Sequence, residues 1–228
     1  MTEHREKLRG IRKYIAEAMR ASNRDHPNGR GYIDIDMTAL LALKAKCEAE
    51  GHRISMSALW AKVVAAGLQQ YPRLNSRIEG DEIIYYDEIN CGIGVDVGFG
   101  LYIIVLRDLA NKTLVETSDE FRALIKKVKE RTLAAEDTQG STFTLTCMTN
   151  SHVKMFESVL TNDQAIIVGT TGVRKEVVVD ENDEIAVRPI STLCLTNEHA
   201  ISDGREADGL TNLLREIALD PEKYIKVM

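Results

Sequence analysis

The chain has 228 residues, of which 44% are hydrophobic and 28% are charged, and its formal net charge is −6. These values are ordinary for a globular protein and exclude a disordered chain, a fibrous repeat and a small disulfide-stapled domain. No basic block stands out, and the apolar runs fall far short of the ~20 residues that a membrane helix needs. We therefore expect no nucleic-acid partner and no membrane span.

The cysteines and the N-terminus indicate a compartment. The four cysteines are scattered along the chain without a CxxC pair, which favours neither a zinc site nor a disulfide framework. The chain opens on MTEHREKLRG, which is charged rather than apolar and so is unlike a secretory signal. We expect a soluble cytoplasmic protein with reduced thiols and no metal.

The spacing of apolar residues, helical in three segments and alternating in one, predicts three helices and one strand in the first third of the chain. In chain order these are a helix over 5–22 built on Leu8, Ile11, Ile15 and Met19; a strand over 31–37; a helix carrying Leu40, Leu43 and Cys47 that stops at Gly51; and a helix that Ser55 or Ser57 caps and Pro72 terminates.

The remainder is richer in strands. Strands are predicted over 75–107, with a hairpin turn at Glu79-Gly80-Asp81 and a break at Gly98 and Gly100; over 141–148; over 164–173; and in a segment that ends at Asn197 after a polar turn at 180–183. Because LYIIVLRD is apolar without alternation, we expect that strand to be buried on both faces. Helices are predicted over 113–133 and around Leu210–Ile217, the second closed by Asp220-Pro221.

This order of elements predicts the fold class. Helices and strands mix without a clean βαβ period, and neither an internal repeat nor a Pro- or Ser-rich linker interrupts them. We therefore expect one α/β domain in which helices pack against a mixed β-sheet.

Of the five histidines, one has a position that suits chemistry. His4, His26, His52 and His152 lie in polar segments and are expected to be solvated surface residues. His199 instead follows an apolar strand and precedes the last helix, where loops present side chains from a rigid scaffold. It could serve as a general base. The alternative is an orienting or core histidine, with Asp203 capping the following helix.

Six segments, in this order, resemble the inner catalytic domain of the 2-oxoacid dehydrogenase dihydrolipoamide acyltransferases, a relative of chloramphenicol acetyltransferase. They are LRGIRKYIAEAMRAS, YIDIDMTAL, SALWAKVVAAGLQQYPRLNSRI, GVDVGFGLYIIVLRDLANKTL, GSTFTLTCM and HAISDG, the last matching H-x-x-x-D-G. The resemblance covers nearly the whole chain. It implies a two-layer sandwich of the chloramphenicol acetyltransferase type, and a single catalytic domain over 1–228 without a lipoyl or subunit-binding domain.

The resemblance also implies a reaction, in which an acyl group moves between coenzyme A and dihydrolipoamide. His199 matches the base that takes the proton of the thiol. Thr146 matches the hydroxyl that stabilises the developing oxyanion, a contribution of roughly 3 kcal/mol. Asp203 matches a structural residue, ion-paired to an arginine, for which the pair Arg12-Lys13 is one candidate source.

An assembly is implied as well. Family members are homotrimers or larger assemblies of trimers, and their active site combines the histidine of one chain with the hydroxyl of the next. Coenzyme A and the lipoyl group enter a shared channel from opposite ends. The expected partners are therefore further copies of this chain and a lipoyl-bearing protein.

Three departures from the family pattern bear on the substrate. The sequence begins almost at the catalytic segment, so the lipoyl group lies elsewhere in a longer chain or is supplied in trans, or the acceptor is different. The usual Asp-His-Arg is Glu198-His199-Ala200, and the strand ends TCMTN after a Ser141 that replaces glycine. The alternatives are an acetyltransferase with a small hydroxyl acceptor and a non-catalytic trimeric scaffold.

Overall fold

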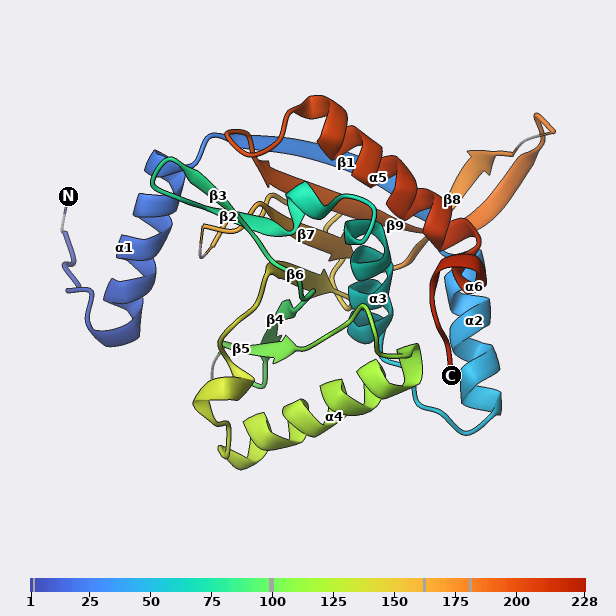
Figure 1. The fold of residues 1–228 in the computed structure, drawn as a ribbon, viewed down its shortest axis with the longest axis horizontal. Coiled ribbons are helices and arrows are strands. Elements are labelled where there is room, and N and C mark those ends of the chain that lie inside the picture. Colours follow the sequence, from blue (N-terminus) through green and yellow to red (C-terminus); the bar gives the residue numbers. More distant parts are fainter. Residues whose placement is uncertain (2, 99–100, 162, 181) are drawn as a thin grey trace.

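The computed structural model describes residues 1, 3–98, 101–161, 163–180 and 182–228. Within them, seven strands form one mixed sheet in the order β1-β9-β7-β6-β4-β5, with β8 paired to β9, while β2 and β3 form a separate hairpin (Figure 1). The strands are β1 (Asn28–Asp36), β2 (Ser76–Glu79), β3 (Glu82–Tyr85), β4 (Cys91–Asp96), β5 (Leu101–Leu106), β6 (Phe143–Met148), β7 (Ile166–Thr171), β8 (Arg174–Val179) and β9 (Ile185–Glu198).

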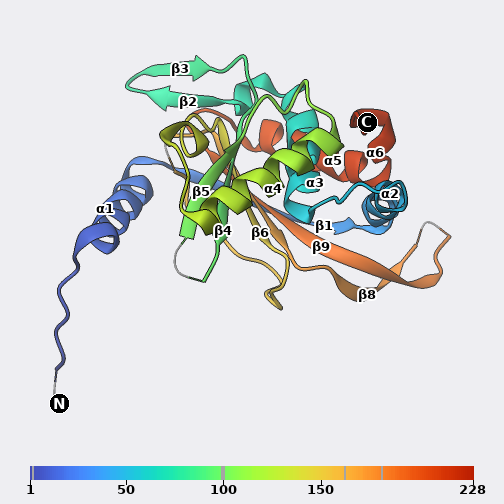
Figure 2. The same ribbon diagram turned by 90° about the horizontal axis from the view of Figure 1, so that it is seen from below.

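Helices cover one face of this sheet. The α-helices are α1 (Gly10–Asp25), α2 (Thr38–Ala49), α3 (Met56–Leu68), α4 (Leu114–Glu130), α5 (Gly204–Leu219) and α6 (Pro221–Tyr224). Helix α3 contacts β6, and α5 contacts β1 and β9. Figure 2 shows α3, α4 and α5 together on one side of the strands. The predicted two-layer arrangement of a mixed sheet and helices is confirmed.

The two faces of the sheet differ in what they bury. Leu195 and its neighbour in β7, Val168, belong to the hydrophobic core beneath the helices. Side chains alternate along a strand, so Cys194 and its partner Gly169 face the opposite side. That side is covered by the irregular segment 149–161, because a Cβ on Gly169 would lie 2.6 Å from the ring of Phe156.

Local signals in the sequence placed several boundaries correctly. Ser55 caps α3, since its hydroxyl accepts from the N–H of Ala58 at 3.0 Å. Gly51, after α2, has φ +93°, and Gly80, in the β2–β3 turn, has φ +59°; both are conformations that suit glycine. These caps and turns depend on neighbouring residues alone, which is why the sequence predicts them.

Two expectations need correction. The first helix begins at Gly10 rather than at residue 5, and Gly10 itself has φ +52°. A short helical segment without packing partners is unstable in water. Strand β5, at the edge of the sheet, is buried on both faces only in its second half: Ile104, Val105 and Leu106 are buried, whereas Leu101 and Ile103 are exposed. Gly100, Glu181 and the side chain of Ile11 lie outside the described residues.

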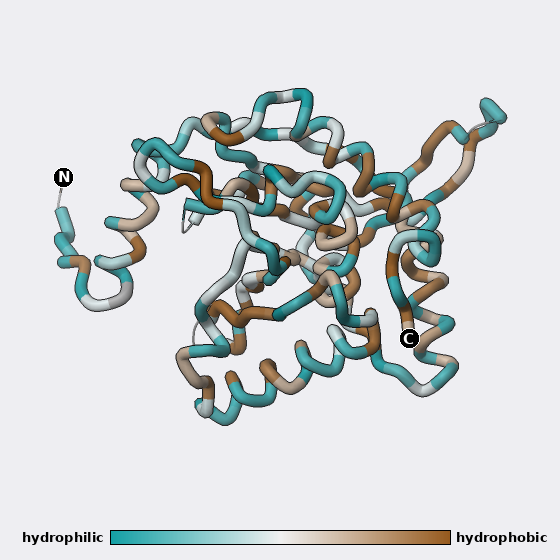
Figure 3. Tube along the Cα trace, viewed as in Figure 1, coloured by the Kyte–Doolittle hydropathy of each residue, from teal (hydrophilic) through white to brown (hydrophobic). Residues whose placement is uncertain are grey.

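The β8–β9 ribbon extends beyond the helices and carries an apolar outer face. Val177 pairs with Val187, and Val179 pairs with Ile185, and all four side chains are exposed by 63% or more. Figure 3 shows hydrophobic stretches along this ribbon on the way to its hydrophilic tip. Across the described ranges, no helix combines the length and apolar character needed to cross a membrane.

Candidate functional site

His199 stands at the junction between the sheet and the last long helix. Strand β9 ends at Glu198, and α5 begins at Gly204. The imidazole is exposed, which excludes the alternative of a core histidine. The predicted strand-to-helix position is therefore correct.

The turn that carries His199 has its backbone fully engaged. Four successive N–H groups donate hydrogen bonds, from His199 to the carbonyl of Pro27 (2.7 Å), from Ala200 to the Glu198 carboxylate (2.9 Å), and from Ile201 and Ser202 to the Glu198 carbonyl (3.1 and 3.0 Å). A turn held at every donor has little freedom to change conformation. The backbone from which the His199 side chain extends is therefore fixed in place.

Asp203 closes this turn as the N-cap of α5. Its carboxylate accepts from the N–H groups of Arg205 (2.9 Å) and Glu206 (3.2 Å). This is the capping role that the sequence offered as an alternative. The arginine that reaches the turn is Arg73, whose Nε donates to the carbonyl of Ile201 at 2.5 Å and lies 3.6 Å from Glu206.

The candidate arginine source, Arg12-Lys13, lies on α1. Lys13 pairs there with Glu17, at 3.7 Å, on the same helix. Within the described chain, the contacts of Asp203 are thus those of a helix cap rather than of an ion pair with α1.

A cavity of about 390 Å³ opens beside His199. It lies between β1 and α5, where small residues, Gly31 on the strand and Ala207 on the helix, leave space between the two backbones. Leu195 and Thr211 also line it. A substrate group seated there would lie next to the imidazole.

The neighbouring glycine of β1 is needed for a different reason. A Cβ on Gly29 would lie 2.4 Å from Oδ1 of Asn197. The amide of Asn197 in turn donates to the carbonyl and hydroxyl of Ser202, at 3.1 and 2.9 Å. Gly29 therefore lets a side chain from β9 brace the turn that carries His199, and periodicity alone gave no signal for this contact.

Thr146, the second candidate, lies on β6 and is half-buried. It pairs with Gly169 of β7, which pairs with Cys194 of β9. Paired residues share a face, so Thr146 faces the side of the sheet away from the helices. Throughout the described chain, no hydrogen bond engages its hydroxyl, which leaves it available to a ligand.

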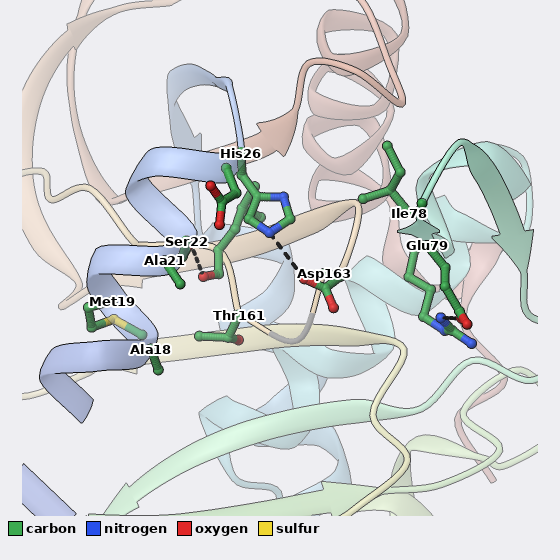
Figure 4. Close-up of a pocket in the computed structure, with 13 residues that line it drawn as sticks. Ala18, Met19, Ala21, Ser22, His26, Ile78, Glu79, Thr161 and Asp163 are labelled. Carbon is green, nitrogen blue, oxygen red and sulfur yellow. Dashed lines mark hydrogen bonds and ion pairs between the residues drawn. The ribbon is translucent and has the colours of Figure 1, made fainter. Parts of the chain in front are cut away.

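His26 was expected to be a solvated surface residue, and this expectation is wrong. Its side chain is only 10% exposed, and one ring nitrogen lies 2.5 Å from Glu198. The other ring nitrogen lies 3.1 Å from Asp163 (Figure 4). The polar sequence around His26 is typical of a surface segment. The burial arises because the end of α1 packs against the end of β9, a contact between residues 172 positions apart.

Among the residues that the structure describes, no three His, Cys, Asp or Glu side chains gather in a way that could hold a metal ion.

Comparison with known proteins shows the family. The sequence matches the model of the 2-oxoacid dehydrogenases acyltransferase (catalytic domain) over residues 1–225. It is 31% identical, over 86% of this chain, to the lipoamide acyltransferase component of the branched-chain alpha-keto acid dehydrogenase complex of Bacillus subtilis (strain 168), covering 47% of that protein.

A second relative is the dihydrolipoyllysine-residue succinyltransferase component of the 2-oxoglutarate dehydrogenase complex of Bartonella vinsonii subsp. berkhoffii. The identity is 28% over 99% of this chain and 56% of that protein. The chain thus spans about half the length of the curated relatives that it matches.

Solved structures agree. A probable dihydrolipoamide acetyltransferase from Listeria monocytogenes 4b F2365 superposes with a TM-score of 0.88 at 28% identity, covering 98% of this chain and 96% of that one. Chloramphenicol acetyltransferase shares the fold with a TM-score of 0.57 at 13% identity, covering 84% of this chain and 86% of that one. From the match over residues 1–225 and these likenesses, the chain belongs to the 2-oxoacid dehydrogenase acyltransferase family, of which it carries the catalytic domain.

Proposed function

We propose that residues 1–228 act as one catalytic domain that moves an acyl group between coenzyme A and a dihydrolipoyl thiol, with His199 as the general base. The observation that carries this proposal is the exposed imidazole of His199, held on a fully bonded turn beside a cavity of about 390 Å³. The names of the relatives, which are lipoamide and dihydrolipoyllysine acyltransferases, support the substrate class.

The reaction uses the imidazole twice. His199 takes the proton of the attacking thiol, which at a pKa of roughly 8.5 is mostly protonated at neutral pH. The thiolate adds to the thioester carbonyl, and the carbonyl π electrons move onto oxygen. When the tetrahedral intermediate collapses, the C–S bond to the leaving thiolate breaks. That thiolate recovers the proton from the imidazolium, so the histidine is regenerated.

Thr146 supplies the hydroxyl that donates to the oxyanion. Within one chain this hydroxyl cannot meet His199. Thr146 pairs with Gly169 of β7, which pairs with Cys194 of β9, and Cys194 lies five residues before His199. Strand geometry separates Thr146 and His199 by about 10 Å across the sheet and about 17 Å along it. The active site therefore forms between chains, as the homotrimers of this family imply. Contacts between copies would also bury apolar surface such as the β8–β9 ribbon.

The test is thioester transfer from acetyl-CoA, and from longer acyl-CoA thioesters, to dihydrolipoamide. The parent protein should release coenzyme A with formation of acyl-dihydrolipoamide, and His199→Ala should lose at least about a hundredfold in kcat, in the range typical of general-base removal. A parent inactive with every thioester would indicate the scaffold alternative. Equal activity of parent and variant would remove His199 from the mechanism.

A further inference from the structure

A buried acid and a buried base lie directly behind the catalytic turn. The side chain of Glu198 is 1% exposed, and its Oε2 lies 2.5 Å from Nδ1 of His26, itself only 10% exposed. The other ring nitrogen of His26 lies 3.1 Å from Oδ1 of Asp163. Figure 4 shows the ring of His26 at the end of α1, pointing toward Asp163. The proposed reaction assigns no role to these groups.

The second oxygen of Glu198 connects this pair to the catalytic residue. Its Oε1 accepts from the N–H of Ala200 at 2.9 Å, and its backbone carbonyl accepts from Ile201 and Ser202. The N–H of His199 is bonded to Pro27, the residue next to His26. Glu198 and its partners therefore hold the chain on both sides of His199.

We propose that His26 and Glu198 are positioning residues, which fix the turn that aims the His199 imidazole at the thiol. This inference rests on the proposed role of His199 as the base. Neither residue lines the cavity beside His199, so both act through the backbone of the turn rather than on the substrate.

The hydrogen bonds around Glu198 depend on which of the neighbouring groups carry protons. The Glu198 carboxylate only accepts, and it faces two donors, the N–H of Ala200 and Nδ1–H of His26. Other charged groups around His26 are Asp163 and its chain neighbour Asp25, with Arg77 and Glu79 across the adjoining cavity. A carboxylate at 198 satisfies both donors whether His26 is neutral or protonated.

Glu198→Gln removes this tolerance while keeping the shape of the side chain. With neutral His26, the glutamine oxygen accepts from Ala200 and its NH₂ donates to Nδ1, so the turn is preserved. With protonated His26, the Nδ1–H donor faces the NH₂ donor of the glutamine, and their hydrogen bond is lost. If the amide flips, the N–H of Ala200 faces that NH₂ instead, and the other hydrogen bond is lost. The variant should therefore resemble the parent when His26 is neutral and lose the turn geometry when His26 is protonated.

The experiment measures kcat and KM with acetyl-CoA and dihydrolipoamide for parent and Glu198→Gln across roughly pH 5 to 8, the interval in which histidines titrate. The ratio of variant to parent kcat should fall by about tenfold or more toward low pH, the scale of a misplaced catalytic group. The KM for acetyl-CoA should stay within about twofold. Circular dichroism at each pH confirms that both proteins remain folded.

A second substitution tests whether the pH dependence of the kcat ratio arises at His26. In Glu198→Gln combined with His26→Gln, no ring remains to protonate, so the ratio to the His26→Gln parent should be flat with pH. The matched control combines Glu198→Gln with His52→Gln, a histidine beyond α2, and should keep the pH dependence. A flat ratio in Glu198→Gln alone, or a dependence that survives His26→Gln, overturns the positioning role. Activity retained by His199→Ala would instead overturn the proposed function.

Discussion

Thr146 lies within the sheet, whereas His199 follows the end of one of its strands, and the two residues are at different ends and on different sides of the sheet. Thr146 shares a row with Gly169 and Cys194 on the face away from the helices, whereas His199 follows the end of β9 beside the α5 cavity. A strand is too stiff to bring the two together. If both belong to one active site, the site must be shared between two chains.

Subunit complementation tests this relationship. Thr146→Val and His199→Ala proteins should each be nearly inactive, the first by about a hundredfold in kcat because an oxyanion donor is lost. In a ring of copies related by rotation, co-expression of both variants rebuilds intact sites wherever a normal histidine meets a normal threonine. Random mixing gives about one quarter of the parent activity, measured by coenzyme A release. Activity no higher than that of the two separate variants would place both groups within one chain or outside the mechanism.

The cap at Asp203 should contribute to stability more than to chemistry. Asp203→Ala leaves the N–H groups of Arg205 and Glu206 without their acceptor, so the free energy of unfolding should fall by about 1 kcal/mol. Asp203→Asn keeps a side-chain oxygen and should lose only a few tenths of a kcal/mol. Urea unfolding compares the two. An equal loss in both variants would show that the carboxylate charge, rather than the cap, is what matters.

Two glycines on β1 should differ in their tolerance of substitution by alanine. Gly29→Ala would push against Asn197 and release its bonds to Ser202, so we expect lower kcat and a lower melting temperature. At Gly31 a Cβ meets nothing within 4 Å, so Gly31→Ala should fold like the parent. The two variants are made and assayed side by side. A fully active Gly29→Ala protein would show that Asn197 does not brace the turn.

Lys62 should make stability depend on pH in the alkaline range. Burial lowers the pKa of this lysine from 10.5 to about 8, while Nζ donates to the carbonyls of Leu109 (2.6 Å) and Lys112. Between these pKa values the unfolded chain binds more protons than the folded one. The free energy of unfolding therefore rises with pH from about 8 to 10.5.

The comparison is between the parent and Lys62→Met. The difference in their free energies of unfolding should shift in favour of the parent by up to about 3 kcal/mol over this range, at 1.36 kcal/mol per pKa unit. Lys126→Met, at a lysine that is 75% exposed, is the matched control and should show no such shift. Guanidinium unfolding at several pH values measures all three. A difference that does not change with pH would show that Lys62 is protonated to the same extent in both states.

Sequence patterns predicted what depends on neighbours along the chain. The Ser55 cap of α3 and the glycine turn at Gly80 are set within a few residues, and the structure has them. They did not predict which apolar strand would be central. LYIIVLRD reads as a buried strand, but β5 pairs only with β4 and leaves Leu101 exposed.

The elements, their order and the placement of His199 between a strand and a helix can be predicted from the sequence, because periodicity and capping are local. The surroundings of that histidine arise only when the chain folds. Pro27, His26 and Arg73 reach its turn from positions more than 100 residues away, through single hydrogen bonds that leave no repeating pattern in the sequence. The register of β6, β7 and β9 likewise decided that Thr146 and His199 lie apart. Strand pairing is a relation between distant segments, so it becomes visible only when the chain has folded.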